Sequence, residues 1–175
     1  MSSKKTVIGT RSLRTISLIV HPIRWAAYAI FLLSTPSAAQ TDSLGAREGV
    51  RQMATAIARD LHSEGPVAWL KYFSHSENFF MVSDGELAFA NFDSADVFVH
   101  NFAKGVHRVD LTWGDMRIDS LSPVLALLAA SYHETVFKEK GVQETPSGYF
   151  TGLVEWSPNG WKLRNVHWSS IRHDR

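Results

Sequence analysis

Side chains able to do acid–base chemistry occur in the last third of the chain, and His167 is the first candidate. An imidazole on a cavity wall can act as a general base or donate a hydrogen bond to a ligand carbonyl. A structural histidine bonded to the backbone or to Ser169 is the simpler alternative, because buried histidines ordinarily have a neighbouring partner. We prefer the simpler interpretation. Both interpretations place His167 on the inner side of the fold.

A second group of candidates lies in the segment 124–138, where Ser131, Tyr132, His133 and Glu134 follow one another. Alternate residues of a strand point to opposite faces, so Tyr132 and Glu134 share one face. The segment is apolar on both faces, which leaves open whether this pair or the other points inward. An inward Glu134 would be a strong acid–base candidate, because burial raises a carboxyl pKa. An outward Glu134 would be an ordinary solvated charge, and an inward His133 would indicate a polar cluster with the histidine of the last strand.

The sequence predicts neither a metal site nor a cofactor. His133-Glu134 begins like the helical zinc motif, but the motif would end in Phe137 and the segment reads as a strand. A Gly-x-Ser-x-Gly elbow, a phosphate loop and a dinucleotide fingerprint are all missing, so nucleophilic catalysis and nucleotide binding are not expected. Asp84 precedes a glycine between two strand-like runs, and we interpret it as a turn residue.

A predicted β-hairpin positions the candidates near the C-terminus. Two strand-like runs, 148–156 and 161–169, flank a Pro-Asn-Gly turn. Folding the turn symmetrically pairs Trp156 with Trp161, Glu155 with Lys162, Val154 with Leu163, Gly152 with Asn165 and Phe150 with His167. This register predicts one apolar face that also carries three polar side chains, those of Asn165, His167 and Ser169.

An apolar wall with a few polar groups is how a ligand pocket is built. The predicted ligand-binding residues are Asn165, Ser169, Tyr132, Phe150 and Leu163. The predicted catalytic candidates are His167, Glu134 and His133. In this form the pocket hypothesis requires that the imidazole of His167 faces an enclosed hollow.

The segments before the hairpin predict helices followed by strands. They are helices over 44–64, over 67–73 and from Asp93 to Gly105, a hairpin over 79–89, and strands over 109–121 and 124–138. The third helix is predicted to bury Phe98 and Phe102, and the first long strand to kink near Gly114. This order predicts an α+β fold with the helices on one face of an antiparallel sheet.

The first 39 residues resemble a secretory signal. Five basic residues precede an apolar run, 25–33, and small residues end the segment at Ala39. A membrane anchor is the alternative, but nine apolar residues span only about 14 Å as a helix. We therefore predict cleavage after Ala39, a single domain over 40–175, and a secreted or periplasmic location without a membrane segment.

Removal of this signal changes the charge of the protein. The chain has 18 basic and 17 acidic residues, and residues 40–175 keep 13 of the basic and all of the acidic ones, for a net charge of −4. No basic stripe remains for nucleic acid, which is not expected as a partner. The chain has no cysteine, so burial of its many aromatic residues must stabilise it without disulfides.

The pattern Trp161-x-Leu163-x-x-x-His167-x-Ser169 resembles the closing strand of SnoaL-like domains, members of the nuclear-transport-factor-two-like superfamily. The upstream order of helices and strands agrees, and the resemblance covers 44–169. It implies a cone-shaped fold in which three N-terminal helices pack on a strongly curved antiparallel sheet that encloses a pocket. Some superfamily members are isomerases, cyclases or dehydratases, many only bind a ligand or a partner, and dimerisation through the sheet is common.

Three functions follow as hypotheses. The preferred one is a pocket domain that binds a small, largely apolar molecule. The second is an isomerase, cyclase or dehydratase that uses a cavity His or Glu for proton transfer. The third is a homodimeric assembly module without a ligand, whose exposed sheet face would carry Trp168 and Tyr149. A homodimer is the expected assembly, and a cavity that contains Glu134 or His133 would favour the enzyme.

Overall fold

The structure, a computed structural model, describes residues 38–171, with side chains from residue 44 onward. Residues 1–37 of the predicted signal lie outside the described residues. The predicted cleavage point, after Ala39, falls in the first turn of α1. The helices are α1 (Ala38–Glu64), η1 (Pro66–Lys71), α2 (Phe92–Phe102) and η2 (Glu139–Gly141). The strands are β1 (Phe80–Ser83), β2 (Glu86–Phe89), β3 (Val106–Ser122), β4 (Leu125–Lys138), β5 (Gln143–Glu144), β6 (Ser147–Ser157) and β7 (Gly160–Ser170). None of the helices in this described range is long and apolar enough to span a membrane.

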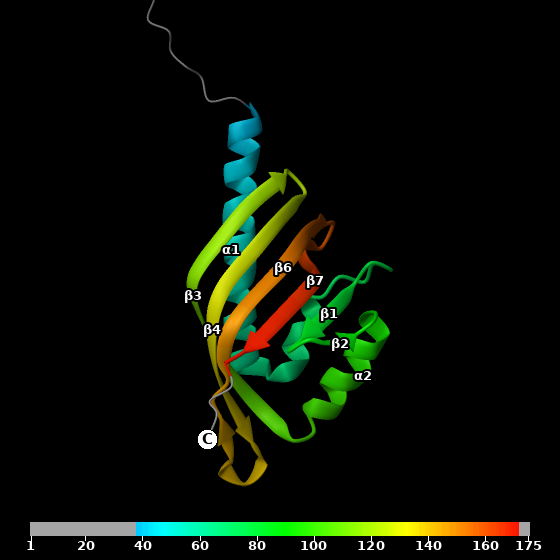
Figure 1. Ribbon diagram of the computed structural model, residues 1–175, viewed down its shortest axis with the longest axis vertical. Helices are drawn as coiled ribbons and strands as arrows, with labels where there is room; N and C mark the ends of the chain where they lie inside the picture. Colours follow the sequence, from blue (N-terminus) through cyan, green and yellow to red (C-terminus); the bar gives the residue numbers. More distant parts are fainter. Residues whose placement is uncertain (1–37, 172–175) are drawn as a thin grey trace, which may run out of the picture. The chain divides into compact units, whose positions relative to one another are not determined.

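The strands form one strongly curled sheet in the order β2-β1-β7-β6-β4-β3, with β5 paired to the edge of β4 (Figure 1). The predicted α+β class is therefore confirmed. The sheet is mixed and not purely antiparallel as predicted, because β1 pairs with β7 in parallel. The chain leaving η1 already runs parallel to β7, since Leu163 N–H donates to Tyr72 O and Ser74 N–H donates to Leu163 O. This segment leads directly into β1.

The long helix α1 fills the concave side of the sheet (Figure 1). Its predicted apolar stripe is confirmed, because Val50, Met53, Ile57 and Leu61 are all buried. The predicted kink near Gly114 is also confirmed: the register of β3 against β4 shifts between Gly114 and Arg117. A bulge of this kind bends a strand and increases its twist, which lets the sheet curl around the helix.

The third helix, α2, begins and packs differently from the prediction. Its N-cap is Asn91, whose side chain accepts a hydrogen bond from Ser94 N–H at 2.9 Å, so the helix begins at Phe92 and not at Asp93. The buried residues of α2 are Ala95 and Val99, four positions apart on one face. The predicted core pair, Phe98 and Phe102, lies on the neighbouring face and is 52% and 37% exposed.

The final hairpin forms as predicted as far as Leu163, and its register then shifts by one residue. Val154 pairs with Leu163, but the next pair is Leu153 with Asn165, so Arg164 is an extra residue in a β-bulge. Because the side-chain period of a strand is two, a slip of one residue moves every later side chain to the other face. Val166 and Trp168 therefore point into the fold, and Phe150 pairs with Trp168 and not with His167.

Candidate functional site

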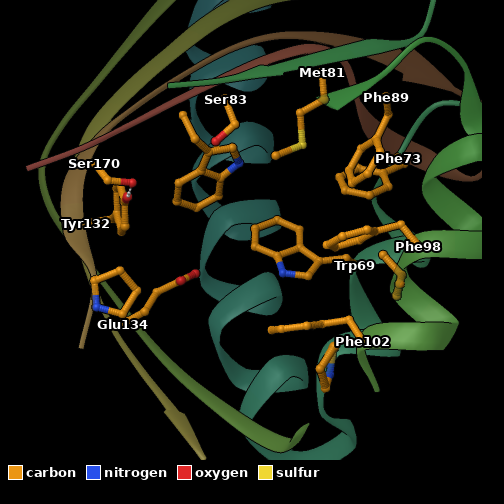
Figure 2. A pocket seen from close by; sticks show the side chains of 14 residues that line it. Trp69, Phe73, Met81, Ser83, Phe89, Phe98, Phe102, Tyr132, Glu134 and Ser170 are labelled. Atoms are coloured by element: carbon orange, nitrogen blue, oxygen red, sulfur yellow. Dashed lines mark hydrogen bonds between the residues drawn. The ribbon is translucent and has the colours of Figure 1, made fainter. Parts of the chain in front are cut away.

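A pocket of about 330 Å³ lies between α2, η1 and the concave ends of β1, β4 and β7 (Figure 2). It is partly open to solvent. The side chains that line it are Pro66, Trp69, Phe73, Met81, Ser83, Phe89, Phe98, Val99, Phe102, Tyr132, Glu134, Pro146, Trp168 and Ser170. Most are aromatic or aliphatic, and the few polar groups lie on the sheet side. This composition is typical of a site for a small organic molecule.

Aromatic side chains hold one another in place around this pocket. Trp69 packs edge-to-face on Trp168, with ring centroids 5.7 Å apart, and is stacked on Phe73. On the helical side Phe98 stacks on Phe102 with centroids 5.9 Å apart. Aromatic pairs in these geometries contribute about 0.5–1.5 kcal/mol each beyond their burial. The walls of the pocket are therefore largely preformed.

The open question about β4 is answered by its packing. Leu128, Ala130 and Tyr132 are buried on the concave face, so Glu134, two residues further on, also points inward. Its carboxyl group extends into the pocket towards Trp69 (Figure 2). Burial raises the pKa of Glu134 to about 7. Within the described residues its carboxyl makes no ion pair or hydrogen bond, so it can exchange a proton near neutral pH.

The raised pKa makes stability depend on pH. The folded protein binds the proton of Glu134 up to about pH 7, whereas the unfolded chain loses it near the ordinary value of 4.5. Folding stability should therefore fall as the pH rises from about 4.5 to 7, by about 3 kcal/mol at most. Glu134→Gln should match the wild type at pH 4 and be more stable than it at pH 8. Urea unfolding at both pH values tests this, with Glu139→Gln, an exposed residue, as the control; equal pH dependence in wild type and Glu134→Gln would contradict it.

A chain of hydrogen bonds lies beside Glu134 at the rim. The hydroxyl groups of Tyr132 and Ser170 lie 3.3 Å apart, and the carboxylate of Asp84 accepts from Ser170 N–H at 2.7 Å and from Ser170 Oγ at 3.2 Å. The prediction of Asp84 as a turn residue is confirmed, with a φ of 49°. Its carboxylate ties the β1–β2 turn to the end of β7. Burial raises the pKa of Tyr132, and the nearby charges of Glu134 and Asp84 raise it further, so the phenol stays protonated.

Most of the predicted site residues lie elsewhere. His133 and His167 are exposed on the outer face, and His167 lies beside a shallow outer depression with Phe80 and Val82. Asn165 donates to Asn78 O at 2.7 Å, and Ser169 donates to Tyr149 O at 3.2 Å, both away from the pocket. The cause for His167, Asn165 and Ser169 is the one-residue bulge at Arg164.

Phe150 and Leu163 do face inward as predicted, but they are fully buried in the core and do not line the pocket. Only Tyr132 and Glu134 of the predicted site residues line it. The prediction that His167 faces the pocket is therefore wrong, and other residues line the pocket.

Several residues of the pocket were missed in the sequence. Trp168 was expected on the outer face, and Phe98 and Phe102 were expected in the core. A signal for the bulge was present, because the apolar residues of the last strand fall at 161, 163, 166 and 168, with one interval of three. No comparable signal shows that Phe98 and Phe102 of α2 line the pocket, because a Phe on a half-exposed helical face and a Phe in the core occur at the same spacing.

A buried carboxylate behind the pocket was also missed. Asp60 of α1, 8% exposed, accepts hydrogen bonds from Tyr72 Oη at 2.7 Å and from Arg59 Nε at 2.8 Å. The hydrogen bond from Tyr72 is the main cause that holds the pKa of Asp60 below its usual range, against the opposing effect of burial. This contact fastens the end of η1 to α1 and so helps to hold Trp69, which lines the pocket, in place. No three His, Asp or Glu side chains in the described chain lie close enough together to hold a metal ion.

Comparisons with solved structures agree with this architecture, whereas comparisons of the sequence alone give no match. No family model matches the sequence. No curated protein matches it either. Among solved structures, a candidate scytalone dehydratase of Novosphingobium aromaticivorans is similar, with a TM-score of 0.63 at 14% identity over 75% of this chain and 91% of the other.

Two further solved structures have the same arrangement. A nuclear transport factor 2-like superfamily protein of Salmonella enterica has a TM-score of 0.57 at 14% identity, over 77% of this chain and 94% of its own. An NTF-2 like protein of unknown function from Shewanella oneidensis has a TM-score of 0.54 at 19% identity, over 71% and 98%. At these identities the likeness concerns the fold and not the chemistry. The described chain has the cone-shaped fold of the nuclear-transport-factor-two-like superfamily, as its closing strand predicted.

Proposed function

We propose that this protein binds a small, largely apolar molecule in the pocket between α2, η1 and the sheet. The observation that carries the proposal is a cavity of about 330 Å³ whose walls are mainly aromatic and which contains one ionisable carboxyl group, Glu134. Apolar walls supply affinity through burial, and a few polar groups orient the ligand. The polar groups are Glu134 and the hydroxyls of Tyr132, Ser83 and Ser170, all on one side of the cavity (Figure 2).

Binding of an aromatic ketone tests the proposal. We expect 2-acetylnaphthalene to raise the melting temperature and to quench tryptophan fluorescence, because Trp69 and Trp168 line the cavity. Phe98→Ala should weaken its affinity by about 3–10-fold through loss of one aromatic wall. Val97→Ala is the matched control, since Val97 is its neighbour on α2, is well exposed and does not line the pocket. Equal affinities of the two variants, or no binding by the wild type, would contradict a ligand in this pocket.

A second candidate function is proton transfer beside a carbonyl group, as in an isomerase, cyclase or dehydratase. The specific observation in its favour is the position of Glu134, whose pKa of about 7 suits a general base at neutral pH. The neutral phenol of Tyr132 on the same wall can donate a hydrogen bond to a developing oxyanion. The Novosphingobium relative, named as a candidate dehydratase, is consistent with this class.

Exchange of protons with solvent distinguishes catalysis from binding. In D₂O the protein should accelerate loss of the methyl proton signal of 2-acetylnaphthalene, followed by NMR. Glu134→Gln should slow this exchange by about 10²–10⁴-fold, and Glu139→Gln should leave it unchanged. Binding without accelerated exchange would support the first candidate over the second.

The location and assembly of the protein are also proposals. The signal-like pattern supports export, and mass spectrometry of the protein from its native host should find Gln40 as the first residue.

The exposed side chains Phe80, Leu127 and Tyr149 on the outer sheet face support a homodimer through that face. Trp168 does not contribute to it, contrary to expectation. Light scattering that gives the mass of one chain at micromolar concentration would exclude the dimer.

A further inference from the structure

The charged side chains at the wall and rim of the pocket are acidic. Glu134 is the ionisable acid among the lining residues, and none of the described residues that line the cavity is Lys, Arg or His. A second carboxylate, Asp84, lies directly behind Ser170 at the rim. Tyr132, between the two, experiences both charges, since each contributes to its raised pKa.

Cationic groups on the neighbouring strand segments do not compensate these carboxylates. Arg108 lies over the ring of Phe137, 3.8 Å from its centroid, and pairs with Asp110 at 3.2 Å. Lys138 pairs with Glu144, and the side chain of His107 is exposed to solvent. Along these segments of the described chain, no cation pairs with Glu134 or Asp84.

The aromatic walls of the pocket also favour a cation. The face of an aromatic ring carries the negative part of its quadrupole and attracts a cation that lies within about 6 Å of its centre. Trp69, Phe98 and Phe102 surround the space into which the carboxyl of Glu134 extends (Figure 2). Trp168 also lines this cavity. An aromatic enclosure with one carboxyl group is the arrangement that recognises organic ammonium ions.

We propose that the ligand of this pocket is a hydrophobic organic amine, whose ammonium group pairs with Glu134 and whose hydrocarbon part lies among the aromatic rings. This inference rests on the proposed binding function and adds the charge class of the ligand. It excludes carboxylates and phosphates as ligands, because the pocket would place them beside Glu134 with no cation to offset the repulsion.

Binding of an amine also requires that Glu134 loses its proton. In the empty pocket the pKa of Glu134 is about 7, so about half of the molecules carry the proton at neutral pH. A bound ammonium ion stabilises the carboxylate, and a proton is released to the buffer. Affinity should therefore rise with pH by about tenfold per unit below pH 7, and level off above it. The lining residues that face Glu134 across the cavity, on η1, α2, β1 and β7, carry no charge, and the titratable groups nearby, Asp84 behind Ser170 and the exposed His107 on β3, do not line it.

Three probes with one ring system test the charge class by calorimetry. They are 1-naphthylmethylamine, which is a cation at neutral pH, 1-naphthalenemethanol, which is neutral, and 1-naphthoate, which is an anion. At pH 7.5 the amine should bind at least about tenfold more tightly than the alcohol, and naphthoate should not bind measurably. Glu134→Gln should remove most of the advantage of the amine, measured as the ratio of the affinities of the same variant for the amine and for the alcohol. Glu139→Gln should behave as the wild type.

The wild-type protein provides a second readout that does not depend on a variant. Titrations of the amine in two buffers with different ionisation enthalpies should show release of about half a proton near pH 7, and affinity should be at least tenfold higher at pH 8 than at pH 5.5. If the alcohol binds as tightly as the amine, without proton release, the amine class is wrong and the pocket function stands. If naphthoate binds best, the amine class is wrong as well. If none of the three binds, both proposals are overturned.

Discussion

Trp168→Ala is expected to lower the free energy of unfolding by about 3–5 kcal/mol. The indole is 9% exposed and packs against four aromatic rings, with centroid distances of 4.5 Å to Tyr132, 4.9 Å to Phe150, 5.7 Å to Trp69 and 6.0 Å to Trp113. Its removal leaves a void at the junction of the core and the pocket, which the preformed walls cannot fill. Guanidinium unfolding of the variant measures the loss.

His167→Ala is the matched control for this prediction. His167 is adjacent in sequence but exposed on the outer face, so its truncation should change stability by less than about 0.5 kcal/mol. A symmetric hairpin register predicts the reverse: a large loss of stability for His167→Ala and little change for Trp168→Ala. A large effect at His167 with a small effect at Trp168 would show that the bulge at Arg164 is wrong, and the pocket with it.

Gly49→Ala is expected to destabilise the protein by about 1–3 kcal/mol, although the same change ordinarily strengthens a helix. A Cβ atom at Gly49 would lie 2.4 Å from Nε1 and 2.9 Å from Cδ1 of Trp161. Trp161 is buried between α1 and the sheet, so its indole cannot move away without disturbing the core. Thermal or urea unfolding should show a lower midpoint.

Gly45→Ala, one turn earlier on α1, separates helix propensity from packing. Nothing lies within 4 Å of a Cβ placed there, and the residue is exposed. This variant should gain about 0.5–1 kcal/mol, because alanine loses less backbone entropy than glycine in a helix. If both variants are stabilised, the close approach of Trp161 to the helix is contradicted.

Local patterns in the sequence were sufficient for the main helices and strands and for two of the hairpin turns, although not for the short η2 and β5. The stripe from Val50 to Leu61 repeats at helical spacing, and Asp84-Gly85 and Pro158-Asn159-Gly160 mark hairpin turns; the glycines adopt φ values of 89° and 92°. Each of these signals involves residues that are close together in the sequence, so it can be recognised without knowledge of the fold. The closing strand also carried enough of a family pattern to predict the cone.

Only the tertiary structure decided which side chains meet in the pocket. The face of β4 that carries Glu134 depends on which apolar residues α1 covers, and both faces looked alike in the sequence. The face of β7 depends on one inserted residue, Arg164, and is set by its neighbours: the Tyr72–Ser74 segment pairs with Leu163, and β1 pairs from Asn165 onward. Strand register is a property of two segments far apart in the chain, and a shift of one residue exchanges inside for outside. For that reason the chain by itself determined the fold, whereas contacts between distant segments determined the site.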